Sequence, residues 1–244
     1  SAEVPDALHS LWMERVDPVR LSFHELTGFF SLTYHGERPL VAGLSERLGH
    51  QESPAVDGYL RHFRDEERKH MALFAGFCER YAGKIYREKK IEMAHALTAP
   101  GEADLRFYLR AVVVEEIGLY YNAALARDAD LPDVVRQINR IHYGDEARHI
   151  AFDKRWLVHH WASLLPTWTR DQIAGLQDWL ARYILHCWAD YYNVDVYADA
   201  GLERPREVRR SAMADPAQVA HRRRASASLL QFLLDAEFLV ESPL

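Results

Sequence analysis

The chain has 244 residues, of which 48% are hydrophobic and 27% are charged. This is the composition of an ordinary globular protein, and it excludes a disordered or fibrous chain. The formal net charge of -6 argues against a nucleic-acid partner, because a dedicated nucleic-acid binder needs a basic surface. No apolar run approaches the roughly 18 residues of a membrane span, so we expect no membrane partner.

The two cysteines, Cys78 and Cys187, lie in apolar, helix-like stretches of the sequence. Two cysteines in a chain of this size do not suggest a disulfide framework. The first residues also lack the basic and apolar regions of a secretion signal. These features predict a cytoplasmic protein.

The apolar residues recur at helical spacing over most of the chain, and strand signals are weak. The first predicted helix runs from about Pro18 to Gly49, with a kink at Pro39. We expect Ser53 to cap the second helix, which would run from Pro54 to about Gly83. A short helix and a polar connection are expected next.

The third predicted helix spans about Ala103 to Arg127, and the fourth runs from about Leu131 to Leu165, where Pro166 stops it. A fifth helix, rich in aromatic residues, is expected from about Arg170 to Tyr197. After a polar, basic stretch, a last amphipathic helix is predicted from about Pro216 to Leu239. The sequence therefore predicts an all-α fold.

No interior linker is long enough to divide the chain into separate units. We expect one domain over residues 1–244. In this interpretation a core bundle occupies about 18–165, and covering helices occupy about 166–244.

Two of the predicted helices contain a glutamate followed three residues later by a histidine: Glu67 with His70, and Glu146 with His149. Residues at this spacing share one face of a helix, so each pair can converge on one ion. Carboxylate and imidazole together favour iron or manganese over zinc. One such pair is usually a solvated helix face. Two pairs on different helices are typical of a di-metal four-helix bundle, which takes one further glutamate from each remaining helix.

The first helix offers Glu37 and Glu25 for this role. If the first two helices are antiparallel, Glu37 and Glu67 differ in height by about 5 Å at the usual rise per residue. Glu25 would lie well away from that level. The spacing favours Glu37.

The third helix offers two adjacent glutamates, Glu115 and Glu116. Glu115 shares its face with the small residues Ala111 and Gly118, which would leave room for ions. Glu116 faces bulkier neighbours. The pattern favours Glu115, and Glu116 is the alternative.

A third histidine, His142, lies four residues before Glu146 on the same face of the fourth helix. It could be a ligand, or it could be bonded to a backbone carbonyl or to water. Glu66 and Asp145 each precede a predicted ligand. They could accept the free N–H of a histidine ligand on the facing helix, or they could be solvated surface acids.

At these residues the sequence resembles the diiron carboxylate proteins of the ferritin-like superfamily. Within that group it resembles the arylamine N-oxygenases typified by p-aminobenzoate N-oxygenase, which carry seven metal ligands, three of them histidines. The resemblance implies the ligand set Glu37, Glu67, His70, Glu115, His142, Glu146 and His149.

The resemblance also implies a ferritin-like four-helix bundle with additional C-terminal helices. It implies two iron ions that alternate between Fe²⁺ and Fe³⁺, with manganese as a second candidate metal. Dioxygen would be the co-substrate and an external donor would supply electrons. The reaction would convert a small-molecule amine to a hydroxylamine or nitro product, with no catalytic residue beyond the ligands. A homodimer is compatible with such a bundle.

Two alternatives share the same ligands: a diiron hydroxylase or oxidase that attacks carbon, and a ferritin-like metal-binding protein or ferroxidase without an organic substrate. An oxygenase needs an organic-sized pocket that reaches the metals, whereas a ferroxidase needs only a path for ions. Arg148 could meet a substrate carboxylate or be solvated. Several aromatic residues could line such a pocket or belong to the core: Tyr108, Tyr120, Tyr121, Trp156 and Trp188.

Overall fold

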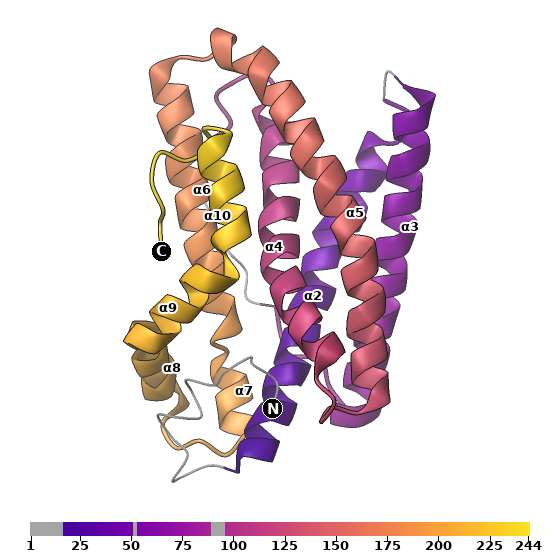
Figure 1. The fold of residues 1–244 in the computed structure, drawn as a ribbon, viewed down its shortest axis with the longest axis vertical. Helices are drawn as coiled ribbons and strands as arrows, with labels where there is room; N and C mark the ends of the chain where they lie inside the picture. Colours follow the sequence, from indigo (N-terminus) through magenta and orange to yellow (C-terminus); the bar gives the residue numbers. More distant parts are fainter. Residues whose placement is uncertain (1–16, 51–52, 89–95) are drawn as a thin grey trace.

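A computed structural model describes residues 17–50, 53–88 and 96–244. Two helical hairpins form the centre of the molecule (Figure 1). The first pairs α2 (Pro18–Arg47) with α3 (Pro54–Phe77), and the second pairs α4 (Glu102–Arg127) with α5 (Asp133–Leu164). No strand occurs among the described residues. The predicted all-α class is confirmed.

Helix α2 begins where the sequence predicts, because the Asp17 side chain accepts a hydrogen bond from the N–H of Val19 at 2.9 Å. The helix continues through Pro39, which lacks the N–H that would bond to the carbonyl of His35. Its buried face carries acidic as well as apolar residues, among them Glu37. The first helix therefore delivers a carboxylate to the interior of the bundle.

Helix α3 starts at Pro54, as predicted, but the Ser53 side chain makes no capping hydrogen bond. The α-helix ends at Phe77 and continues as a π-helical turn, Cys78–Ala82. Gly83 follows with a φ of 67°, a conformation that a glycine adopts without strain. The predicted end near Gly83 is thus the end of the π-helical turn. Residues 84–88 are not helical, and 89–95, where the short helix is expected, lie outside the described residues.

The C-terminal part of the chain packs against one side of the bundle, with α6 and α10 beside α4 (Figure 1). Its elements are α6 (Arg170–Tyr191), α7 (Val194–Asp199), α8 (Pro205–Ala214), α9 (Pro216–Ala225) and α10 (Ala227–Asp235). A short 3-10 turn, Leu165–Thr167, joins α5 to α6. Buried apolar side chains of α4, α5, α6 and α10 form one continuous core.

Two predicted C-terminal helices are each divided in the structure. The fifth ends at Tyr191, because the Asn193 side chain accepts from the N–H of Asp195 at 3.0 Å and starts α7. The last is interrupted at Ser226, whose buried hydroxyl accepts from the indole N–H of Trp188 at 2.9 Å. These interruptions depend on tertiary contacts that helical periodicity does not contain.

Helix α8 is not predicted by the sequence, which is polar and basic in this stretch. It is only 10 residues long and buries just Val208 and Ala212, too few for a clear apolar pattern. None of the described helices is both long and apolar enough to cross a membrane.

Helices α2 and α4 pack closely at Gly43, where an added Cβ would overlap the ring of Phe107. The guanidinium of Arg47 lies 3.8 Å from the centre of that ring and holds it in place. We expect Gly43→Ala to lower the free energy of unfolding by about 1–3 kcal/mol, through overpacking.

The control is Gly76→Ala on α3, where nothing lies within 4 Å of the added carbon. This variant should gain roughly 0.5–1 kcal/mol from helix propensity. Urea denaturation measures both changes. If the two variants were equally stabilised, the ring of Phe107 would move aside without cost, and the overpacking argument would be wrong.

Candidate metal centre

The candidate metal centre lies between the four helices of the two hairpins. Each of its side chains points inward from α2, α3, α4 or α5, and none is more than 5% exposed. They are Glu37, Glu67, His70, Glu115, His142, Glu146 and His149. The structure therefore brings together all seven residues that the sequence singles out, from positions more than a hundred residues apart.

These side chains form two overlapping groups. In each group, one ligand atom from every member lies within 4.8 Å of the others. The first group is Glu37, His70, His142 and Glu146, and the second is Glu67, Glu115, Glu146 and His149. Glu146 belongs to both. The arrangement has the form of two adjacent cation sites with one shared carboxylate.

The three imidazoles turn one ring nitrogen towards the carboxylates. Nδ1 of His70 lies 3.2 Å from a Glu146 oxygen, and Nδ1 of His149 lies 2.7 Å from a Glu67 oxygen. His142 is reversed, with Nε2 3.0 Å from Glu146. Each of these nitrogens could supply a lone pair to an ion, because the other nitrogen of the ring is engaged elsewhere.

The outward nitrogens of two histidines donate to acids on the facing helix. Nε2–H of His70 donates to Asp145 at 3.0 Å, and Nε2–H of His149 donates to Glu66 at 3.0 Å. Arg148 donates to both acids, at 2.6 Å to Glu66 and 2.7 Å to Asp145. Arg148 is therefore paired with these two acids, and it does not line the cavity described below.

Asp145 is kept ionised by the groups that donate hydrogen bonds to it. Burial raises the pKa of Asp145, but hydrogen bonds from Lys69, His70 and Arg148 outweigh burial and bring the pKa below its usual range. An ionised Asp145 keeps the proton of His70 on Nε2. The inward Nδ1 is then free to bind a cation.

Sequence reasoning missed the partner of the third histidine. The buried side-chain amide of Asn122 lies beside Nδ1 of His142, at 2.5 Å. The other amide atom of Asn122 has no hydrogen-bond partner. Since the oxygen and nitrogen of an amide have the same shape, the orientation in which the oxygen accepts Nδ1–H satisfies the pair. Asn122 follows Glu115 by two helical turns on the same face of α4, and that spacing was the available signal.

The carboxylates are strongly desolvated. Both oxygens of Glu115 are buried without a hydrogen-bond partner, and burial together with the charge of Glu146 raises its pKa well above the usual value. Burial and the charges of Glu146 and Glu37 likewise raise the pKa of Glu67. Burial also acts to raise the pKa of Glu146, but the three imidazoles lower it further than burial raises it. A buried carboxyl group without a donor is stable only if it is protonated or if a cation lies beside it.

The donor set fits two divalent metal ions. Its four carboxylates would balance two ions of charge +2, and its mixture of oxygen and nitrogen without thiolate suits iron or manganese. The oxygens of Glu115 have no hydrogen-bond partner and lie within reach of Glu67, Glu146 and His149, so a cation would fit beside them.

The two alternative glutamates lie outside both groups. Glu116 forms an ion pair with Lys154 and accepts from the hydroxyl of Ser228 at 3.3 Å. Glu25 is also buried on α2, but it lies nearer the start of that helix than Glu37 does, away from the centre. The structure thus groups Glu37 and Glu115 with the histidines.

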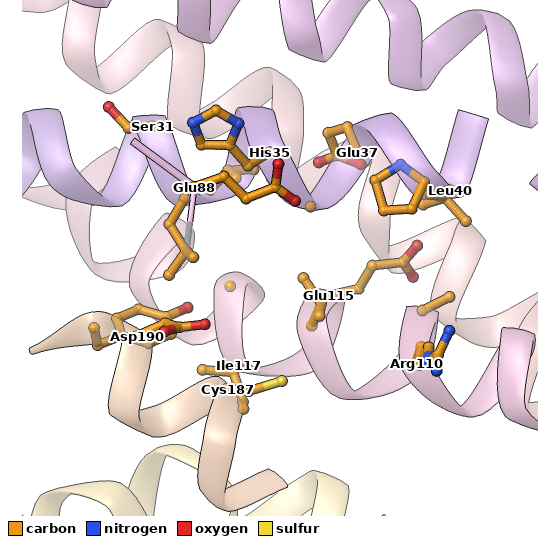
Figure 2. Close-up of a pocket in the computed structure, with 18 of the residues that line it drawn as sticks. Ser31, His35, Glu37, Leu40, Glu88, Arg110, Glu115, Ile117, Cys187 and Asp190 are labelled. Carbon is orange, nitrogen blue, oxygen red and sulfur yellow. The ribbon is translucent and has the colours of Figure 1, made fainter. Parts of the chain in front are cut away.

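A cavity of about 370 Å³ opens onto this centre between α2, α4 and α6. Glu37, Glu115 and His142 form part of its wall, as Figure 2 shows for the two glutamates. Its aromatic lining consists of Tyr86, Phe107, Tyr183 and Tyr191. The five aromatic residues considered from the sequence do not line it and instead pack in the core.

An all-helical bundle with buried carboxylates and imidazoles at its centre defines the class of ferritin-like metal proteins. A family model described as P-aminobenzoate N-oxygenase AurF matches residues 7–237. The chain belongs to this family, which confirms the resemblance seen in the motifs, and it is an oxidoreductase. No curated protein and no solved structure matches it.

The hydrogen bond from His70 to Asp145 generates a prediction about metal affinity. Asp145→Asn removes the charge that fixes the His70 tautomer, so metal affinity should fall about 10- to 100-fold. Titration of the metal-free protein with Mn²⁺ measures the change. The matched control is Asp65→Asn, since Asp65 is an exposed acid on α3 that pairs with Arg64. Equal affinities of the two variants would contradict a positioning role for Asp145.

Proposed function

We propose that this protein is a non-haem diiron oxygenase that uses dioxygen to oxidise a small organic substrate. The most direct version is N-oxygenation of an aryl amine to a hydroxylamine and then a nitro product. The observation that carries the proposal is a cavity of organic size that ends on three of the seven buried donors. Membership of the N-oxygenase family supports it.

In this proposal the two groups of donors hold two iron ions. Glu37, His70 and His142 would hold one ion, and Glu67, Glu115 and His149 would hold the other, with Glu146 shared. Iron is proposed over manganese because the reaction needs a metal that readily reduces dioxygen. When bound, the pair of ions supplies that redox chemistry. Each oxygen transfer to nitrogen consumes one dioxygen, two electrons and two protons and releases one water, so an external donor must supply electrons.

The chain's own residues would bind the substrate and orient the imidazoles of the metal centre. The cavity wall is mostly apolar, which excludes water from the substrate. Glu37 and Glu115 stand at the boundary between the cavity and the buried donors, so a substrate amine seated there lies beside the reacting centre. Asp145, Glu66 and Asn122 keep the imidazoles oriented.

The covering helices have a part in this function. We propose that residues 1–244 form one domain in which the bundle holds the metals and the helices after 165 close the substrate cavity. Tyr183, Cys187 and Tyr191 of α6 line the cavity opposite α2. The electron donor, a homodimer and a cytoplasmic location stay predictions from the sequence.

The cavity also separates the alternatives. A ferroxidase needs a path for an ion, and a cavity of about 370 Å³ lies within the size range of small-molecule sites. Attack on carbon would use the same donors, so the family relation is what favours nitrogen. We therefore rank N-oxygenation first.

The adjacent glutamates of α4 give the sharpest test of the ligand set. Glu115→Ala should remove at least about half of the bound metal, because both oxygens of Glu115 are buried with no hydrogen-bond partner in the protein. Glu116→Ala should leave metal content unchanged, since Glu116 pairs with Lys154. Metal analysis after anaerobic loading with Fe²⁺ measures both, and circular dichroism verifies folding. Equal metal contents would refute the assignment of Glu115.

Filling the cavity tests whether an organic substrate is used. An added Cβ at Gly118 meets nothing within 4 Å, because Gly118 faces the cavity. Gly118→Leu should therefore leave metal content intact while reducing product formation from aryl amines at least about tenfold.

The control for this variant is Gly144→Leu on α5, which is exposed, has open space at its Cβ and does not line the cavity. Product is measured by chromatography and Fe²⁺ oxidation by absorbance. Oxidation of Fe²⁺ without any amine product in the unaltered protein would favour the ferroxidase alternative.

A further inference from the structure

A buried acid outside the metal centre, Glu25, lines a small pocket next to the far end of the cavity. It precedes Glu37 on α2 by 12 residues, which places it about 18 Å along the helix axis. Its side chain is 6% exposed, and its Oε2 is buried with no hydrogen-bond partner. Burial raises the pKa of Glu25 well above the usual value. The bundle therefore contains a desolvated carboxyl group that the metal centre does not use.

Glu25 faces a small pocket that adjoins the large cavity. The pocket has a volume of about 10 Å³, room for one group the size of a water molecule. It shares with the cavity the lining residues Gly28, Leu32, Asp190, Tyr191 and Asn193. A ligand in the large cavity can thus extend a single small polar group towards Glu25.

A second carboxylate, Asp190 of α6, lines both spaces. In Figure 2 it lies at one side of the cavity, well separated from Glu37 and Glu115. The amide of Asn193 stands at the same end. The basic side chain of Arg110 lies at the other side, beyond Glu115. The end remote from the metal centre therefore has two carboxyl groups, those of Glu25 and Asp190.

The narrowness of this end depends on close packing of α7 against α2. An added Cβ at Gly28 would lie 2.7 Å from Cγ2 of Val196, so only glycine permits this approach. The approach brings the residues around Asn193 over the Glu25 pocket. The small volume excludes a carboxylate or a ring but accepts an ammonium group.

We propose that Glu25 and Asp190 form a recognition site for a cationic end group, so that the substrate is an elongated amine with a second, basic nitrogen. The inference rests on the proposed function. The protonated nitrogen occupies the small pocket and donates to the two carboxyl groups, and the amine that is oxidised lies at Glu37 and Glu115. A cation gains charge-assisted hydrogen bonds at Glu25, whereas an anionic end group would meet two acids.

The test compares three anilines that differ only at the end of a para alkyl chain: an ammonium, a methyl or a carboxylate. Each is titrated calorimetrically into the reduced, metal-loaded protein without dioxygen, so that no turnover occurs. We expect the ammonium probe to bind at least about tenfold more tightly than the methyl probe, and the carboxylate probe to bind most weakly.

Two variants assign that preference to the acids. Glu25→Gln and Asp190→Asn should each weaken the ammonium probe at least about tenfold and leave the methyl probe unchanged. The control is Glu46→Gln, an exposed acid on the same helix. If the amide at position 25 prevents folding, the position 190 variant decides the question alone.

Equal binding of the three probes would overturn the inference, as would an ammonium preference that survives both substitutions. Glu25 would then be a structural acid. Failure of the proposed function is a separate result: it would appear as absence of bound metal or of amine oxidation. In that case, titration of the metal-free protein with the same three probes still measures the preference for an ammonium group.

Discussion

The cost of burying four carboxylates at the centre of a helical bundle governs the rest of this structure. A desolvated carboxylate without a donor is unfavourable by several kcal/mol, so a bundle of this kind is stable only if cations or donors meet each charge. Three imidazoles contact Glu146 and lower its pKa. Glu115 has no such partner and its pKa is raised. The protein part of the site is thus unbalanced, and two metal ions would complete it.

The same constraint extends outward in layers. Each imidazole presents one nitrogen to the centre and engages the other with a side chain behind it. Glu66 and Asp145 are in turn bridged by Arg148, at the surface of the bundle. Because each of these two acids lies on the helix opposite to the histidine that it binds, both acid–histidine hydrogen bonds tie α3 to α5. The network that orients the ligands therefore also holds the helices at the spacing that the ligands need.

The C-terminal helices supply part of the wall of the cavity that opens onto the candidate metal centre. Helix α6 forms the cavity wall opposite α2, and its Asp190 marks the end remote from the centre. Packing of Gly28 against Val196 brings α7 close and narrows that end. The cavity consequently has two chemically different ends, one at the candidate metal donors and one at Asp190, beside the small pocket of Glu25. This polarity would orient an elongated substrate before any reaction takes place.

The sequence by itself determined the four helices of the bundle and both Glu-x-x-His pairs, because helix periodicity and the i, i+3 relation are local properties of the chain. An estimate of height from helical rise was enough to favour Glu37. Tertiary structure decided the rest. Glu115 and Glu116 are neighbours on one helix, and in the packed structure Glu115 joins the centre whereas Glu116 pairs with Lys154 of α5 and with Ser228. The partnership of Asn122 with His142, the divided C-terminal helices and the cavity all arise from contacts between distant segments. Local periodicity cannot encode such contacts, since they depend on how the helices pack against one another.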